Sequence, residues 1–406
     1  MESLAAGSEL IPAPRSLYVH VPFCFHKCHY CDFYSFVDKS DQQQAFIESL
    51  ELELAVAARF VPPGELRTLF VGGGTPSLLR VDLWRRLLET LDRHFSLRNR
   101  GPESAAEFTV ECNPETVTPE LMNVLAAGGV NRVSIGAQSF DDRHLKTLER
   151  WHNPANVERA VDMAAQAGIA RRSIDLIFGI PGQTLDEWRT DLDVALKIAS
   201  RAHGLEHLSC YDLTYEPNTA MTKRLQRGEF TAIDESVEMA MFRLTRSVLA
   251  ANGFDAYEVS NFARGAEAQC RHNLAYWRQE QWLACGPSAS GHVAGWRWKN
   301  APSLGEWMRG LESGGGFGPV QDVECPDPRR ALAEWLMTGL RLREGVRIDD
   351  AIAAAGQLGR SEQLRNAARR SSSKGFLNAA DGVWALSDEG VLVGDSVAAE
   401  LMASLG

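Results

Sequence analysis

The chain has 406 residues, of which 45% are apolar, and a formal net charge of −11. This length suffices for one large core with a second, smaller domain. The negative charge argues against a nucleic-acid-binding protein, because such a surface needs a basic face.

The six strands expected in the first half alternate with segments of helical length. β-branched and aromatic runs predict strands at residues 17–21, 68–71, 108–112, 132–135, 173–178 and 208–213. Amphipathic segments predict helices at residues 42–59, 81–94, 119–127, 155–167 and 185–199, with Thr118 and Thr184 as N-caps. Right-handed crossovers would curl these units into an α/β fold, a partial (β/α)6 barrel with its functional loops at the carboxyl ends of the strands.

The second half has a different pattern. A long helix is expected at residues 233–251, followed by an aromatic-rich stretch that suggests a packed lid or a surface for a flat ligand. Its large rings are Tyr257, Tyr276, Trp277, Trp282, Trp296 and Trp298. Glycines 314–316, with the prolines that follow, indicate a linker.

The last segment combines helices with a short hairpin at Asp381 and Gly382, and it resembles a winged helix. Its acidic residues would repel phosphate, so we expect it to pack against the barrel rather than bind DNA. We therefore divide the chain into a barrel (residues 1–230), an extension (231–318) and a C-terminal, helical, winged-helix-like domain (319–406).

Targeting signals are not evident in the sequence. The N-terminus lacks a basic segment ahead of an apolar run, and no stretch of about 18 apolar residues occurs. We therefore expect a cytoplasmic protein. In a reducing compartment, cysteines close in sequence indicate metal or redox sites rather than disulfides. The isolated cysteines are expected to be packing residues: Cys112, Cys210, Cys270, Cys285 and Cys325.

Three cysteines, Cys24, Cys28 and Cys31, follow the first predicted strand within one loop. They could bind zinc, with His26, His29 or a distant residue as the fourth ligand. They could instead bind a [4Fe–4S] cluster whose fourth iron stays open for an exogenous ligand. The first alternative predicts a closed structural site and the second a functional one.

Polar or glycine-rich positions also occur at the ends of later strands. The triple glycine in "GGGTP", residues 72–76, follows the second strand, where backbone amides could contact a ligand. Glu111 ends the third strand, where it could accept hydrogen bonds from ribose hydroxyls. Gln138 and Arg150 follow the fourth strand, and Asp175 lies in the fifth. We expect these side chains to surround one site.

The spacing Cys-x3-Cys-x2-Cys, with Tyr30 before the third cysteine, resembles the signature of the radical S-adenosylmethionine (SAM) superfamily. This resemblance implies a [4Fe–4S] cluster whose open iron is chelated by the amino and carboxylate groups of SAM. It also implies that the cluster passes one electron to the sulfonium, which yields a 5′-deoxyadenosyl radical.

Further motifs, among them "YVHVPFC", "GGGTPS", "VECNPE" and "IDLIFGIPGQT", resemble the group that contains oxygen-independent coproporphyrinogen III dehydrogenase and heme chaperones of the HemW type. The resemblance implies that Cys24, Cys28 and Cys31 hold the cluster. It implies one SAM position lined by Tyr18, Gly73, Glu111 and Thr214. It implies a second lined by Tyr30, Gly74, Thr75, Gln138, Arg150 and Asp175.

Two features separate these relatives. The dehydrogenases carry a further cysteine after the third and a longer leader, whereas this chain has Asp32-Phe33 and 23 residues before Cys24. Conversely, "RHNLAYW" resembles a chaperone element, which implies a heme site made by His272, Asn273, Tyr276 and Trp277. From the residues alone, His272 is equally well explained as a buried, hydrogen-bonded histidine, and His292 is a second candidate ligand.

The resemblance implies a heme chaperone that passes heme to an acceptor protein. It allows that acceptor to be membrane-associated and the chain to form a homodimer. The alternative is a coproporphyrinogen III dehydrogenase that oxidatively decarboxylates propionate side chains. A zinc-stabilised binding protein is the third alternative. Whether SAM is cleaved or only bound stays open.

Overall fold

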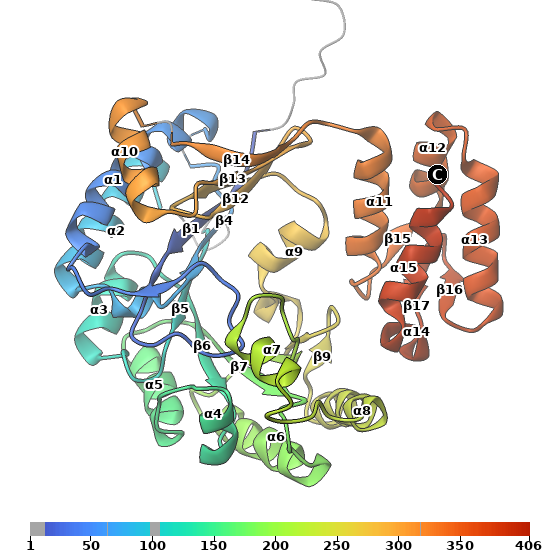
Figure 1. Ribbon diagram of the computed structural model, residues 1–406, viewed down its shortest axis with the longest axis horizontal. Coiled ribbons are helices and arrows are strands. Elements are labelled where there is room, and N and C mark those ends of the chain that lie inside the picture. The colour runs from blue at the N-terminus through green and yellow to red at the C-terminus, as the bar shows by residue number, and fades with distance from the viewer. Residues whose placement is uncertain (1–12, 63, 98–105, 317) are drawn as a thin grey trace, which may run out of the picture.

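The computed structural model describes residues 13–62, 64–97, 106–316 and 318–406 (Figure 1). The expectation that the chain starts without a targeting segment concerns residues 1–12, which lie outside this description. In the described part, no helix is both long enough and apolar enough to cross a membrane.

Six parallel strands lie side by side in chain order, which confirms the predicted partial barrel. They are β1 (Ser16–Val21), β4 (Thr68–Gly73), β5 (Glu107–Cys112), β6 (Arg132–Gln138), β7 (Arg171–Phe178) and β8 (His207–Asp212). The helices on the outside of the barrel are α1 (Gln43–Ala57), α2 (Val81–Phe95), α3 (Pro119–Ala127), α4 (Asp142–Thr147), α5 (Ala155–Gln166), α6 (Leu185–Ala199) and α8 (Glu235–Ala251) (Figure 1). Both predicted caps are present: Thr118 accepts from the amide of Leu121, and Thr184 forms a capping box with Glu187.

The two faces of the barrel strands differ in chemistry. In β1, Leu17, Val19 and Val21 are fully buried in the core beneath the helices. Because successive side chains point to opposite faces, Tyr18 and His20 point into the barrel. The same alternation recurs in later strands, so the apolar core lies outside the sheet and polar side chains gather inside it.

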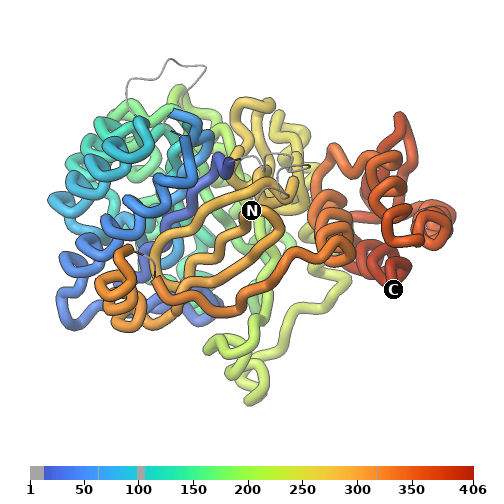
Figure 2. Tube along the Cα trace, turned by 90° about the horizontal axis from the view of Figure 1, so that it is seen from above, coloured from blue at the N-terminus to red at the C-terminus, as the bar shows by residue number. Residues whose placement is uncertain are grey.

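Six further strands extend this sheet beyond both of its predicted edges. At one edge, β11 (Trp282–Cys285) pairs parallel to β1, and it is followed by antiparallel β12 (Ser290–Val293), β13 (Trp296–Asn300) and β14 (Val320–Glu324). At the other edge lie β10 (Asn261–Ala263) and β9 (Asp255–Ala256). β11 and β13 contain Trp282, Trp296 and Trp298, so half of the large rings of the aromatic-rich stretch belong to the sheet. Figure 2 shows the orange extension beside the blue N-terminal strands.

Among the described residues before the C-terminal domain, three further α-helices are not part of the helical layer around the barrel. α7 (Ala220–Gln226) follows β8, α9 (Arg271–Trp277) precedes β11, and α10 (Leu304–Ser313) packs on α1. The short strands β2 (Phe23–Cys24) and β3 (Phe36–Val37) pair with each other and enclose the loop that contains Cys28 and Cys31.

The C-terminal domain has the expected winged-helix-like arrangement. Helices α11 (Pro328–Gly339), α12 (Ile348–Gln357) and α13 (Ser361–Ser373) pack with a small sheet made of β15 (Val346–Arg347), β16 (Leu377–Ala380) and β17 (Val383–Leu386). The last helices are α14 (Asp388–Leu392) and α15 (Gly394–Ala403). The predicted hairpin is present, and Asp381 and Gly382 both have positive φ, as its turn requires.

The predicted linker lies elsewhere than expected. Glycines 314–316 connect α10 to β14, and β14 still belongs to the large sheet. The passage to the C-terminal domain instead follows β14, between Glu324 and the start of α11. No pattern of buried positions predicts β14, because its residues are all exposed.

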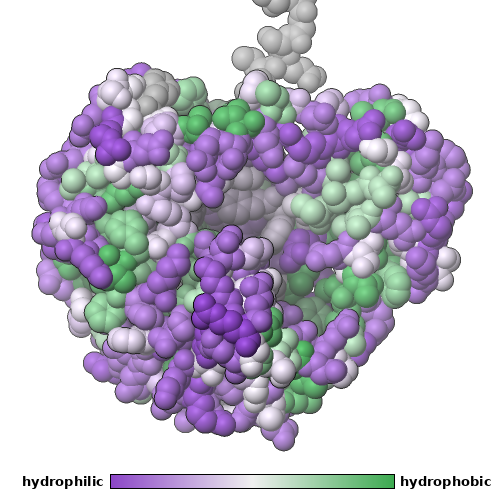
Figure 3. All heavy atoms as spheres, viewed as in Figure 1, coloured by the Kyte–Doolittle hydropathy of each residue, from purple (hydrophilic) through white to green (hydrophobic). Residues whose placement is uncertain are grey.

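The C-terminal domain packs against the barrel, as expected. The amide of Arg343 donates to the carbonyl oxygen of Tyr257 at 3.0 Å, and Arg278 forms a two-bond ion pair with Glu344. A cleft of about 430 Å³ lies between the domains, with Phe178 and Asp212 among its lining on the barrel side. Figure 3 shows the surface hollowed between the two domains.

Four of the five isolated cysteines are buried, as expected of packing residues. Cys325 is exposed, so the expectation was wrong there. It lies in the short passage between β14 and α11, which offers no core for its side chain.

Candidate functional site

The three clustered cysteines lie at the carboxyl end of β1. Cys24 is in β2 and is buried, whereas Cys28 and Cys31 are partly exposed in the loop that follows. One hydroxyl and one guanidinium group donate hydrogen bonds to these sulfur atoms. Thr75 Oγ1 is 3.5 Å from Cys24 Sγ, and Arg150 Nη1 is 3.7 Å from Cys28 Sγ. Hydrogen bonds of this kind stabilise sulfur in its thiolate form.

Burial opposes ionisation of these thiols in the absence of a metal. It raises the pKa of Cys31 to about 11 and also raises the pKa of Cys24. A metal that binds thiolate sulfur compensates this cost, so metal binding releases protons here.

The three cysteine sulfurs are suitable ligands for zinc and for an iron–sulfur cluster, because both bind the thiolate form. Among the described residues, these sulfurs are not all within 4.8 Å of one another.

The glycine loop after β4 packs against the cysteine loop. A side chain at Gly74 would place its Cβ 2.7 Å from the carbonyl oxygen of Phe23, and Gly73 has a φ of +108°. The amide of Gly73 donates to Glu111 Oε2 at 3.0 Å, and the next two amides donate to carbonyl oxygens of β1 and β2. These amides, proposed from the sequence as ligand contacts, thus have acceptors within the protein, and the glycines provide close packing.

Glu111 and Asp175 face each other inside the barrel from β5 and β7. Ser134 Oγ donates to the carboxylate of Asp175 at 3.0 and 3.1 Å. Burial, together with the negative charge of Asp175, raises the pKa of Glu111 to about 7. Burial also raises the pKa of Asp175. Two acceptors of this kind suit hydroxyl or ammonium groups of a ligand.

The raised pKa of Glu111 predicts a pH-dependent stability. Between about pH 4.5 and 7 the unfolded chain loses this proton while the folded chain keeps it, so folding stability falls as the pH rises. We expect Glu111→Gln to stabilise the ligand-free chain at pH 8 relative to pH 5, by an amount on the order of 1–3 kcal/mol.

Urea unfolding of the wild type and Glu111→Gln at both pH values measures this difference. The exposed Glu362 supplies a control, since Glu362→Gln should change stability equally at the two values. An identical effect of Glu111→Gln at pH 5 and pH 8 would contradict the assignment.

Gln138 and Arg150 meet at the carboxyl end of β6. Gln138 has a φ of +64° at an irregularity in the pairing with β7. Arg150 Nη2 donates to the carbonyl oxygen of Gly136 at 3.0 Å, while its buried Nε has no hydrogen-bond partner among the described residues. A positive φ outside glycine is strained, and such strain is typical of functional sites. An unpartnered guanidinium nitrogen here fits a carboxylate ligand.

The remaining predicted SAM contacts lie around the same end of the barrel or within it. Tyr18 points into the barrel, and its hydroxyl lies 3.0 Å from Nδ1 of His20. Tyr30 packs in a small apolar cluster that includes Leu148. Thr214 is exposed just beyond β8. The structure thus groups the predicted residues from the cysteine loop to β8 at successive strand ends.

The predicted heme element forms α9, which contacts the first residues of β4 and β5 and so lies at the opposite, amino end of the barrel. Glu107, the first residue of β5, accepts from the amides of Arg271 and His272 at 3.0 Å each. A carboxylate at this position stabilises the N-terminus of a helix. α9 therefore covers the amino ends of β4 and β5.

His272 is buried, and both of its ring nitrogens are occupied. Nδ1 lies 2.8 Å from Thr68 Oγ1, and Nε2 lies 2.9 Å from the Tyr276 hydroxyl. Burial and the positive charge of Arg132 lower its pKa to about 3, so the ring is neutral. In this arrangement neither nitrogen is available to iron, which favours the structural alternative for His272.

The aromatic side chains connect α9 to the extension strands. The Tyr276 ring contacts Trp282 with a centroid distance of 4.5 Å, and Trp282 contacts His292 at 4.9 Å. Trp277 lies under the guanidinium of Arg341, and Asn273 is partly exposed. Of the two candidate heme ligands, His292 is therefore the more accessible.

Two further residues of the site were not singled out from the sequence. His20 Nε2 lies 2.8 Å from the carbonyl oxygen of Tyr34, so His20 joins β1 to the cysteine loop. His152 lies two residues after Arg150, and burial together with the positive charge of Arg150 lowers its pKa to about 4. The alternation in "SLYVHV" could have placed His20 inside the barrel, whereas no local signal distinguishes His152.

Comparisons with known proteins agree with this geometry. A family model described as the radical SAM superfamily matches residues 18–195. The structure of coproporphyrinogen III oxidase (HemN) from Escherichia coli superposes with a TM-score of 0.80 at 19% identity, covering 96% of this chain and 90% of that one. The fold and the cysteine loop thus define a radical SAM protein, and membership of this superfamily implies a [4Fe–4S] cluster and SAM as cofactors.

Curated relatives narrow the class. The heme chaperone HemW of Bacillus subtilis is 31% identical over 94% of this chain and 98% of that protein. HemW of Mycobacterium tuberculosis is 34% identical over 96% and 95%, and HemW of Escherichia coli is 33% identical over 93% and 96%. The chain belongs to the HemW family.

Proposed function

We propose that this protein is a heme chaperone, which binds heme and transfers it to an acceptor protein. The observation that carries the proposal is the similarity to curated heme chaperones over nearly the whole chain. The likeness to HemN at 19% identity concerns the fold alone. The alternative of a coproporphyrinogen III dehydrogenase is disfavoured by Asp32-Phe33, which stands where those enzymes carry a further cysteine.

The proposed cluster site consists of Cys24, Cys28 and Cys31. When bound, the [4Fe–4S] cluster supplies an open iron for SAM and a source of single electrons. Thr75 and Arg150 donate hydrogen bonds to the cysteine sulfurs, which favours their thiolate form. Removal of either donor should therefore alter the reduction potential of the cluster, because hydrogen bonds to sulfur set that potential.

The proposed SAM site lies at the carboxyl ends of the barrel strands, next to the cysteine loop. The unpartnered Nε of Arg150 supports a role in binding a carboxylate, and the buried carboxyl groups of Glu111 and Asp175 support a role in accepting from amino or hydroxyl groups. Gln138, held at positive φ, adds an amide beside Arg150. The remaining family-matched residues, Tyr18, Tyr30, Gly73, Gly74, Thr75 and Thr214, stay proposed contacts.

The proposed heme ligand is His292. Its Nδ1 lies 3.3 Å from the carbonyl oxygen of Glu280. Histidines that bind metal commonly donate one ring N–H to such a carbonyl, which leaves Nε2 free to ligate. Trp282 offers an aromatic surface beside the ring. The nearby Arg297 and Arg330 both pair with Glu334, so they would have to exchange that partner to bind propionate groups.

Heme titration of His292→Ala tests this assignment. We expect heme affinity to fall at least tenfold and the Soret band to lose the features of imidazole coordination. The exposed His203 supplies a matched control, because His203→Ala should bind heme as the wild type does. An unchanged spectrum and affinity in His292→Ala would remove His292 as the ligand while leaving the chaperone proposal intact if the wild type binds heme.

A further inference from the structure

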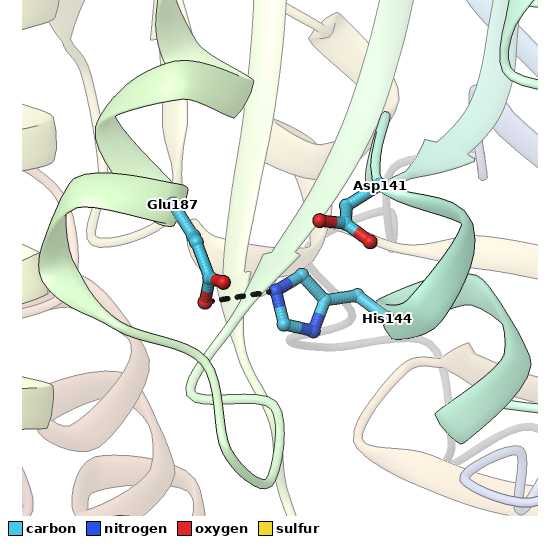
Figure 4. Close-up of side chains that lie close together, drawn as sticks. All are labelled: Asp141, His144 and Glu187. Atoms are coloured by element: carbon cyan, nitrogen blue, oxygen red, sulfur yellow. Dashed lines mark ion pairs between the residues drawn. The ribbon is translucent and has the colours of Figure 1, made fainter.

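Two helix N-termini on the rim of the barrel bring together Asp141, His144 and Glu187 (Figure 4). Asp141 is the N-cap of α4, His144 lies in that helix, and Glu187 lies in the first turn of α6. One donor atom of each residue lies within 4.8 Å of the other two. These residues are separate from the cysteine loop and from the proposed SAM and heme contacts.

His144 has a buried ring nitrogen that points into this group. The residue is only 4% exposed, and its Nε2 faces Glu187 Oε2 at 3.3 Å (Figure 4). That contact lacks hydrogen-bond geometry, and Nε2 has no hydrogen-bond partner among the described residues. Buried polar atoms are rarely left in this state, so an unfilled position beside Nε2 needs an explanation.

Both carboxylates are ionised at neutral pH. The hydrogen bond from the Thr184 amide and that from Arg143 lower the pKa of Glu187 to about 2. Hydrogen bonds from Arg143 also lower the pKa of Asp141. The group therefore presents two negatively charged carboxylates beside the imidazole of His144.

Arg143 neutralises this charge in the structure. Its Nη2 lies 2.6 Å from Asp141 Oδ2 and 2.6 Å from Glu187 Oε1, but the side chain is 70% exposed. Exposed ion pairs contribute little free energy. The guanidinium can therefore turn into solvent when a doubly charged ion enters.

We propose that Asp141, His144 and Glu187 form a binding site for one divalent transition-metal ion of the Zn²⁺ or Mn²⁺ class. A mixed imidazole and carboxylate set suits these ions, whereas Ca²⁺ and Mg²⁺ prefer oxygen ligands alone. Three protein ligands leave further positions for water.

The ion would fix the position of α4, and the residues directly after α4 contact the cysteine loop. Directly after α4, the carbonyl oxygen of Leu148 accepts from the amide of His29, Glu149 pairs with His26, and Arg150 donates to Cys28. A metal that ties α4 to α6 therefore holds these three contacts in place.

Titration of the full-length, cluster-loaded chain with Mn²⁺ alone, followed by the electron paramagnetic resonance signal of free Mn²⁺, tests the site. We expect one Mn²⁺ bound per chain and its displacement by an equimolar amount of Zn²⁺, because Zn²⁺ binds such ligands more tightly. Glu187→Gln should weaken binding at least tenfold while preserving the capping box, since glutamine also serves there. His144→Gln should also weaken Mn²⁺ binding at least tenfold.

Arg143→Ala separates a metal site from a network of ion pairs. Loss of the competing guanidinium should tighten Mn²⁺ binding several-fold. A matched control is Glu344→Gln, which removes a carboxylate paired with Arg278 elsewhere and should leave Mn²⁺ binding unchanged. Absence of stoichiometric binding in both the wild type and Arg143→Ala, or equal binding by Glu187→Gln, His144→Gln and Glu344→Gln, would overturn the proposal.

Discussion

Replacing Cys28 by alanine is expected to reduce the iron and sulfide content from about four each per chain to near zero after anaerobic reconstitution. Three cysteines are the only protein ligands proposed for the cluster, and the fourth iron is left to SAM, so no spare ligand can compensate. Iron and sulfide analysis, with the broad thiolate-to-iron absorption, measures the loss.

Cys325 provides the matched control for this experiment. It is the exposed cysteine between β14 and α11, so Cys325→Ala should retain the full cluster content. Stoichiometric zinc in place of iron after anaerobic isolation of the wild type would contradict the cluster and support the zinc alternative.

Replacing His272 by alanine is expected to destabilise the protein by about 3 kcal/mol rather than to remove a heme ligand. The change deletes two buried hydrogen bonds and leaves the hydroxyls of Thr68 and Tyr276 without their partner. It also removes a ring that stacks on Phe70. Urea unfolding of the cluster-loaded protein measures the change.

The exposed His203 again serves as the control, because His203→Ala should alter stability by less than about 0.5 kcal/mol. In the folded His272→Ala variant, the heme spectrum should keep its imidazole features. If His272→Ala kept wild-type stability but its Soret band lost the features of imidazole coordination, His272 would instead be the ligand.

Local patterns explain why the barrel could be predicted. The six strands and the caps at Thr118 and Thr184 depend on residues adjacent in sequence, and the cysteine spacing itself defines one loop. The extension strands were missed because β11 to β14 are short and β14 is exposed throughout. The first of them, β11, pairs with β1, which lies more than 250 residues earlier, and the others pair in turn from β11.

The environment of His272 could not be predicted for a related reason. Thr68 lies 204 residues from His272, and Glu107 lies 165 residues away, so nothing in "RHNLAYW" reveals that α9 closes the amino end of the barrel. The sequence correctly offered a buried histidine as one alternative. The choice between the alternatives required the fold.

Heme binding by the wild-type, cluster-loaded protein tests the proposed function most directly. One preparation is divided, and one half receives heme while the other receives coproporphyrinogen III with SAM and a reductant. We predict that one heme per chain is retained through gel filtration and then passes to an added apo-heme protein, while no protoporphyrinogen IX forms. Sustained formation of protoporphyrinogen IX without retention of heme would contradict it.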